Sequence, residues 1–121
     1  MRRDGLTEQL GGSARGFSWT AEAREGILIV SVKGELDLAV TTEEGAQLGQ
    51  LAKRDERLVV IDLRHVTFLD SSGLRSLVAI RNGLKERGGR LLLGDLSDPV
   101  RRVIDVSGLR DWFEYVDRAA F

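Results

Sequence analysis

A strand–helix–strand pattern across residues 58–93 constrains the fold of this chain more than any other feature of its sequence. The pattern begins with a continuous apolar run at residues 58–61, which is typical of a strand buried on both faces. Apolar side chains at helical spacing follow, and Gly88-Gly89 ends this predicted helix before a second predicted strand, which starts with Arg90-Leu91-Leu92-Leu93. Two strands joined in this way form a βαβ unit, which requires a right-handed crossover and a parallel sheet.

The residues before this unit predict two strands and a helix. Residues 17–24 and 27–32 are expected to form the strands, and the second is apolar on both faces, which favours a central position in the sheet. The helix is expected to begin with Thr41 as its N-cap, with Glu44 completing a capping box. Residues 1–16 show no sustained hydrophobic period, so we expect them to be a flexible leader.

The residues after this unit predict a further helix and a last strand. Asp98 is expected to be the N-cap of the helix, with Pro99 as its first residue and Gly108 at its end. Residues 112–116 are expected to form a short strand. Taken together, the elements predict one α/β domain at residues 17–121, with a mixed sheet of four to five strands, βαβ crossovers and three to four helices.

Composition and charge exclude several classes of function. The chain has 18 Lys and Arg against 19 Asp and Glu, and this balance provides no basic field for nucleic acid. It has no cysteine, which excludes disulfides and thiol chemistry. Its apolar runs are too short to span a membrane, and residues 1–5 lead into no apolar segment of a secretion signal. We therefore expect a cytoplasmic protein that binds neither nucleic acid nor membranes.

Parallel strands would bring several polar residues to one edge of the sheet. If the strands that end near Lys33, Leu63 and Leu93 run parallel, their carboxyl ends share the edge where ligand and partner sites form in open α/β sheets. The residues that this arrangement predicts at one rim are Asp37, Asp70, Ser71, Ser72 and Asp95.

Ser71 and Ser72, at the start of the predicted helix, allow two interpretations. In the first, one of them or Asp70 simply caps the helix. In the second, a serine is a phosphorylation switch, and the phosphate adds about −1.5 to −2 charges. A helix N-terminus favours negative charge by roughly 0.3–1 kcal/mol, whereas a docked partner with acidic groups would lose several times as much. A serine at this position can therefore switch binding without unfolding the protein.

The neighbouring residues also have two interpretations each. Gly73 either keeps the hydroxyls accessible to an enzyme or is merely tolerated at a helix start. Arg75, three residues after Ser72, either pairs with a phosphate or is solvated. Asp37 either forms a turn or contacts a partner.

The residue patterns needed for catalysis are missing. His65 is the only histidine, and no potential ligand stands at metal-binding spacing from it, so we expect a surface residue. The surroundings of Ser72 lack the glycines of a nucleophile elbow, and no glycine-rich phosphate-binding loop occurs. We therefore predict a protein that is not an enzyme and that has no metal and no cofactor.

The sequence resembles the STAS domain of bacterial anti-sigma factor antagonists. The resemblance rests on V-V-I-D-L at residues 59–63 and on F-L-D-S-S-G-L at residues 68–74. It extends back to G-E-L-D at residues 34–37 and forward through Gly88-Gly89, Val103 and Ile104 to S-G-L at residues 107–109, so that it covers residues 17–117. It implies a STAS-like fold.

The resemblance also implies a partner-switching mechanism in stress response or sporulation. In that family, the unmodified antagonist binds an anti-sigma factor that is also a serine kinase, and this frees a sigma factor. The kinase phosphorylates the second serine of the motif, here Ser72, with Ser71 as the second choice, and a metal-dependent serine phosphatase reverses the step. By the same resemblance, Ser71 caps the helix, and the residues expected to contact the partner are Asp37, Asp70, Ser71, Gly73, Leu74 and Arg75. The exposed face of the helix at residues 72–87 would be the main contact.

Two other functions stay open at this point. One is a non-switching STAS scaffold or transporter-associated structural module. The other is a receiver-type domain with a phosphoacceptor aspartate, which needs a lysine after a late strand, and no lysine follows Lys85. The sequence leaves open whether a weak homodimer forms.

Overall fold

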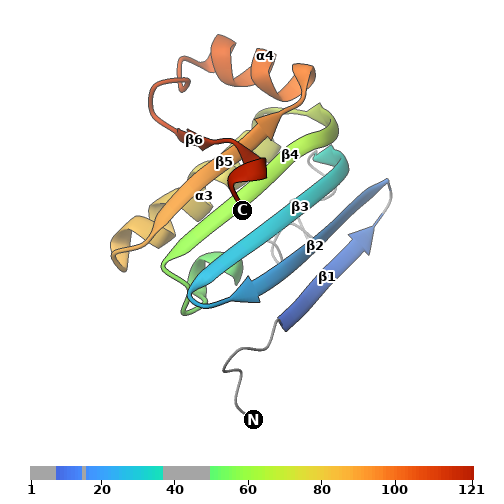
Figure 1. Ribbon diagram of the computed structural model, residues 1–121. Helices are drawn as coiled ribbons and strands as arrows, with labels where there is room; N and C mark the ends of the chain where they lie inside the picture. Colours follow the sequence, from blue (N-terminus) through green and yellow to red (C-terminus); the bar gives the residue numbers. More distant parts are fainter. Residues whose placement is uncertain (1–7, 15, 37–49) are drawn as a thin grey trace.

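A computed structural model of the chain describes residues 8–14, 16–36 and 50–121. These residues form one six-stranded mixed sheet in the order β1-β2-β3-β4-β5-β6 (Figure 1). The first three strands are paired antiparallel, and the pairs from β3 to β6 are all parallel. The bounds of the strands are β1 (Glu8–Ala14), β2 (Phe17–Arg24), β3 (Ile27–Leu36), β4 (Leu58–Leu69), β5 (Arg90–Leu96) and β6 (Glu114–Val116).

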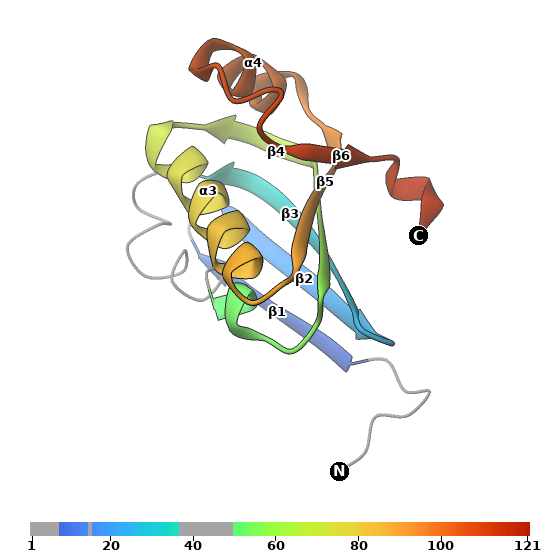
Figure 2. The ribbon, with the colours of Figure 1, turned by 90° about the vertical axis from the view of Figure 1, so that its left-hand side faces the viewer.

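Among the described residues, helices lie on both faces of the sheet (Figure 2). α3 (Ser71–Glu86) covers one face, and α4 (Asp98–Ser107) packs against β4. Two short 3₁₀ helices complete the described elements, η1 (Gln50–Lys53) and η2 (Arg118–Ala120). Figure 2 shows α3 on one side of the sheet and η2 on the other. No helix within the described ranges has the length and apolar character that a membrane span requires.

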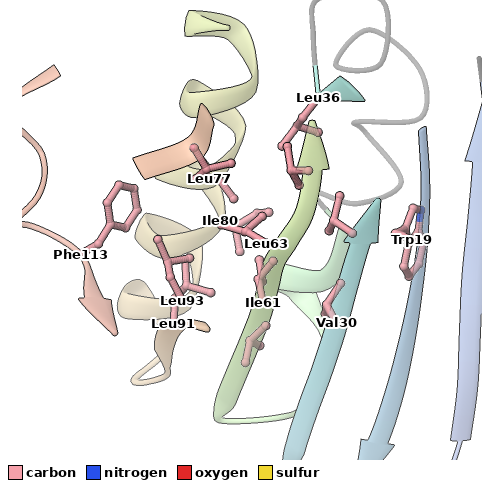
Figure 3. Packing of buried hydrophobic residues seen from close by; sticks show 14 of the residues in the cluster. Trp19, Val30, Leu36, Ile61, Leu63, Leu77, Ile80, Leu91, Leu93 and Phe113 are labelled. Atoms are coloured by element: carbon pink, nitrogen blue, oxygen red, sulfur yellow. The ribbon is translucent and has the colours of Figure 1, made fainter. Parts of the chain in front are cut away.

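The core lies between the sheet and α3. Leu77, Ile80 and Leu84 are almost fully buried at the spacing of one helix face and pack against the sheet. Figure 3 shows Ile61 and Leu63 of β4 at the centre of this packing. Both faces of β4 are buried along its first half, which explains why the sequence of this strand begins with a continuous apolar run.

The predicted strand–helix–strand unit is confirmed, with β4 and β5 parallel on either side of α3. The central position of the second predicted strand is also confirmed, because β3 lies between β2 and β4. The class of fold is therefore as predicted, but the sheet has six strands where four to five were expected. Two α-helices occur in the described residues, fewer than the three to four expected.

The expectation of a flexible leader over residues 1–16 is wrong for Glu8–Ala14. This segment forms β1 and pairs with β2 along its entire length, from Glu8 opposite Ala23 to Ala14 opposite Phe17. A salt bridge of 2.8 Å between Arg54 Nη2 and Glu8 Oε1 holds its first residue. Pairing with a neighbouring strand thus overrides the low strand propensity of a segment that contains Gly11 and Gly12.

The start of α4 differs from the prediction. Ser97, and not Asp98, is the N-cap of α4, because its Oγ accepts a hydrogen bond from Val100 N. The helix predicted from Thr41 falls largely on residues 37–49, which lie outside the described residues. Its predicted end is a 3₁₀ turn, η1.

β4 continues well past the run that predicted it. Leu63 is its last residue paired with β5, opposite Leu96, whereas its pairing with β3 continues to Leu69 opposite Leu36. The second half of β4 therefore extends beyond β5 and leads directly into the serine motif, where α3 begins.

Candidate functional site

Asp70 joins β4 to α3 and caps the helix. Its backbone is extended, with φ −104° and ψ −176°, and its Oδ1 accepts a hydrogen bond of 2.9 Å from Gly73 N. Its carbonyl oxygen accepts the first intrahelical bond, from Leu74 N at 3.0 Å. The implied role of Ser71 as the helix cap is therefore wrong, because Asp70 is the N-cap.

The hydroxyls of Ser71 and Ser72 do not cap α3. Ser71 and Ser72 are the first two residues of α3; Ser71 is exposed and Ser72 is half-buried. Within the part of the chain that the structure describes, neither hydroxyl has a hydrogen-bond partner. The first N–H groups of a helix also lack intrahelical partners, so hydroxyls and N–H groups lie together at the positive end of the helix dipole.

Gly73 lets the first turn of α3 contact the end of β3. A Cβ at this position would lie 2.2 Å from Leu36 O and 2.6 Å from Leu69 Cδ1. The same Leu36 oxygen accepts a hydrogen bond from Asp70 N at 3.4 Å. The glycine is therefore required by packing, a reason that neither of its two sequence-based interpretations contained. This contact fixes the position of the serines relative to the sheet.

The other predicted contact residues divide between core and surface. Leu74 is only 8% exposed and belongs to the core, and Gly73 is buried, so both support the site from beneath. Arg75 is exposed one turn after the serines. Asp37 lies outside the described residues.

Phe68 is an exposed aromatic residue next to the serine motif, and the sequence did not predict it as a site residue. It is 47% exposed, although its neighbour Leu69 and the nearby Val66 are buried. The pairing of β3 with β4 shifts register here, with Gly34 opposite Val66 and the next residue of β3 opposite Phe68. One extra residue of β4 is thus bulged out, which changes the alternation of the strand. An apolar residue in a strand pattern does not reveal such a bulge.

Asp95 and His65 lie away from the serines. Asp95 lies at the level where β4 and β5 stop pairing, and its Oδ2 is 3.5 Å from Arg64 Nη2. The serine motif is a further seven residues along β4, which is up to about 20 Å at the rise of a strand. The predicted rim therefore unites Asp70 with the two serines but not with Asp95. His65 is exposed on β4, as expected.

The geometry offers a surface for modification and binding. In residues 8–14, 16–36 and 50–121, no three side chains of His, Cys, Asp or Glu are grouped to hold a metal ion. What the site provides is an accessible hydroxyl pair, an exposed arginine one turn later, and an aromatic ring on the adjoining strand.

Comparisons with known proteins found consistent matches. The family model of the STAS domain matches residues 18–119. The chain is 33% identical over 89 residues to the anti-sigma F factor antagonist of Paenibacillus polymyxa, covering 73% of this chain and 76% of that protein. An anti-sigma factor antagonist from Mycobacterium paratuberculosis is similar in structure, with a TM-score of 0.72 and 29% identity, over 82% of this chain and 84% of that one. The Bacillus cell fate determinant SpoIIAA in its phosphorylated form has the same fold, with a TM-score of 0.65 and 21% identity over 84% and 94% of the two chains.

Proposed function

Because this chain belongs to the STAS domain family, we propose that it is an anti-sigma factor antagonist whose binding is switched by phosphorylation of Ser72. The names of its relatives support the general role, since they are anti-sigma factor antagonists. The observation that carries the proposal is the capping of α3 by Asp70, which leaves both serine hydroxyls available.

The partner in this proposal is an anti-sigma factor that is also a serine kinase. It would transfer the γ-phosphoryl group of ATP to Ser72 Oγ: the new O–P bond forms, the bond to ADP breaks, and the hydroxyl proton passes to a base of the kinase. A metal-dependent serine phosphatase would restore the hydroxyl by hydrolysis and release inorganic phosphate. The chain itself would be a substrate and a binding protein in the cytoplasm, with no enzymatic step of its own.

The fold tolerates a phosphate at this position. The positive end of the dipole of α3 favours the added negative charge by roughly 0.3–1 kcal/mol. Arg75 lies three residues after Ser72, at a spacing that lets a guanidinium reach the phosphate. A partner docked on the same surface would instead face about two additional negative charges and a larger group. Phosphorylation would therefore release the partner and leave the scaffold folded.

Ser71 is the alternative acceptor, since it is the more exposed of the two. The choice of Ser72 rests on the family resemblance of the motif. Phosphorylated SpoIIAA supports the idea that a protein of this fold is modified in such a way.

The test uses the full chain and two matched variants, Ser72→Ala and Ser71→Ala. Each is incubated with a lysate of the native organism and with ATP, and phosphate incorporation and captured proteins are identified by mass spectrometry. We expect the unmodified chain to capture an anti-sigma factor and release it on incubation with ATP. Ser72→Ala should keep the capture but take up no phosphate, whereas Ser71→Ala should behave like the parent. Uptake lost only in Ser71→Ala would reassign the site, and no uptake by any form would refute the switch.

A further inference from the structure

A hollow of about 320 Å³ lies beside the C-terminal end of α3, between this helix and the strands β5 and β6. Three cations, Arg81, Lys85 and Arg90, line it together with Trp112 and Glu114. It is separate from the serine motif, because the length of α3 between Ser72 and Lys85 is about 20 Å at the rise of a helix. The proposed phosphorylation of Ser72 does not use this hollow.

Two of its positive charges have no compensating carboxylate. Glu114 pairs with Arg90, and the hydrogen bond from Arg90 lowers the pKa of Glu114, which keeps that carboxylate charged. Arg81 and Lys85 form no salt bridge with any residue that the structure describes. The lining therefore carries a net charge of about +2, and a ligand of negative charge is the one it attracts.

The guanidinium of Arg81 is held in place for recognition. Its Cζ lies 4.1 Å from the ring centroid of Trp112, a cation–π contact. Phe113 in turn packs against Trp112 at an interplanar angle of 81°. Stacking fixes the plane of a guanidinium but leaves its N–H groups at the edge. Arg81 Nη1 donates to Asn82 Oδ1 at 3.3 Å, and the remaining N–H groups match the two oxygens of a carboxylate. The ring face that Arg81 covers is unavailable for stacking a nucleobase.

The backbone N–H groups at Gly88 and Gly89 are not available to bind a phosphate in the hollow. Gly88 N donates to Lys85 O and Gly89 N donates to Leu84 O, at 3.1 and 2.7 Å, so these N–H groups are used to close the helix. The hollow also lies at the negative end of the dipole of α3, which opposes a doubly charged anion. Phosphate sites on helices use free N–H groups at the opposite end. Recognition here rests on side chains and favours a group of single charge.

We propose that this hollow binds a carboxylate group, with Arg81 donating to both carboxylate oxygens, Lys85 supplying a second positive charge, and the apolar part of the ligand lying against Trp112. The carboxylate belongs either to an Asp or Glu side chain of a protein or to a small free acid. This site goes beyond the proposed switch and does not depend on it.

The test is a titration of the ¹⁵N-labelled full chain followed by NMR. Hexaglutamate is the probe for a protein side chain, glutarate is the probe for a small acid, and hexaglutamine is the neutral control. We expect the indole signal of Trp112 and the amide signals of Gly88 and Gly89 to shift with hexaglutamate or glutarate. The indole of Trp19, which is buried in the core, should not move. Binding of only the peptide would assign the site to protein partners, and equal binding of glutarate would assign it to a small acid.

Variants then test which side chains bind the carboxylate. Arg81→Gln should weaken the binding about tenfold or more, because it removes a charged two-pronged hydrogen bond. Lys85→Gln should weaken it about threefold, as expected for an exposed charge. Lys33→Gln, which removes an exposed positive charge from β3, should have no effect and serves as the control. An unchanged Trp19 signal shows that each variant is folded.

Three results would overturn the proposal. The first is the absence of any shift at Trp112 with both acids. The second is tighter binding of inorganic phosphate than of glutarate, which would show a general anion site. The third is an equal loss of binding in Lys33→Gln and Arg81→Gln, which would show attraction by overall charge alone.

Discussion

The two ends of α3 are adapted to negative charge by different means. At the N-terminal end, Asp70 caps the helix and the first N–H groups lie beside the hydroxyls of Ser71 and Ser72. At the C-terminal end, Gly88 adopts φ +80° and the N–H groups are all consumed in closing the helix. A charge at the first end is accommodated by the backbone, whereas a charge at the second end is accommodated only by Arg81 and Lys85.

This difference predicts which end is suited to a covalent switch. A phosphate added at the first end meets a favourable dipole and a backbone fixed by the contact of Gly73 with Leu36. Side chains at the second end can move, and their charges are screened by salt. The serine end is therefore suited to a covalently attached group and the arginine end to non-covalent, salt-sensitive binding.

The largest effect on the fold should come from the contact that fixes the serine end. Gly73→Ala should lower the free energy of unfolding by about 1–3 kcal/mol or more, because a Cβ cannot fit against Leu36 O without moving the helix. Urea unfolding measures this loss. Ser71→Ala, two residues away and exposed, is the control and should be close to neutral. Equal stability of the two variants would show that the first turn of α3 is free to shift.

The next effect concerns the binding of the partner. Ser72→Asp should weaken the affinity for the captured anti-sigma factor about tenfold, which corresponds to about 1.4 kcal/mol, because a negative charge is introduced into the proposed interface. Calorimetry with the purified partner measures this change. Arg102→Gln, at an exposed position of α4, also lowers the net charge by one unit and gives a control for charge alone. A loss of the same size in both variants would place the interface elsewhere.

The capping bond should have an effect of about 1 kcal/mol. Asp70→Ala removes the acceptor of the 2.9 Å bond from Gly73 N and should lower the free energy of unfolding by about that amount. Asp70→Asn keeps an acceptor and should lose less. Ser97→Ala removes the longer cap of α4, at 3.4 Å, and should also lose less. If Asp70→Ala were as stable as the parent, a serine would have taken over the cap.

The smallest effect concerns the ion pair at the arginine end. The hydrogen bond from Arg90 lowers the pKa of Glu114 below its ordinary value. A depressed pKa in the folded state contributes stability above the unfolded pKa, and this stability is lost as the pH falls through the folded pKa. Both side chains are exposed, so the contribution is small. NMR titration of Glu114 should show its pKa rising in Arg90→Gln, and an unchanged value would contradict the pairing.

The sequence predicted the elements whose pattern is dictated by burial. The run at residues 58–61 and the helical stripe on α3 are apolar because they face the core, so their type could be predicted. β1 could not be predicted in this way, because its pairing with β2 and the bond from Arg54 to Glu8 are long-range contacts. The second half of β4 was missed because its exposed residues interrupt the apolar run.

The serine motif could be identified from the sequence, but its local geometry could not. Capping by Asp70 or by a serine fits the same motif, and only the backbone geometry distinguishes them. The requirement for Gly73 depends on Leu36 O, a backbone atom 37 residues earlier in the chain. The exposure of Phe68 depends on a bulge. The last two features are set by a neighbouring strand and not by local sequence.

The most direct test of the central claim uses the chain phosphorylated at Ser72. Its free energy of unfolding and its affinity for the anti-sigma factor are each compared with those of the unmodified chain. We predict a stability within about 1 kcal/mol of the unmodified chain together with an affinity about a hundredfold lower. A phosphorylated chain that unfolds, or one that still binds its partner with undiminished affinity, would contradict the account.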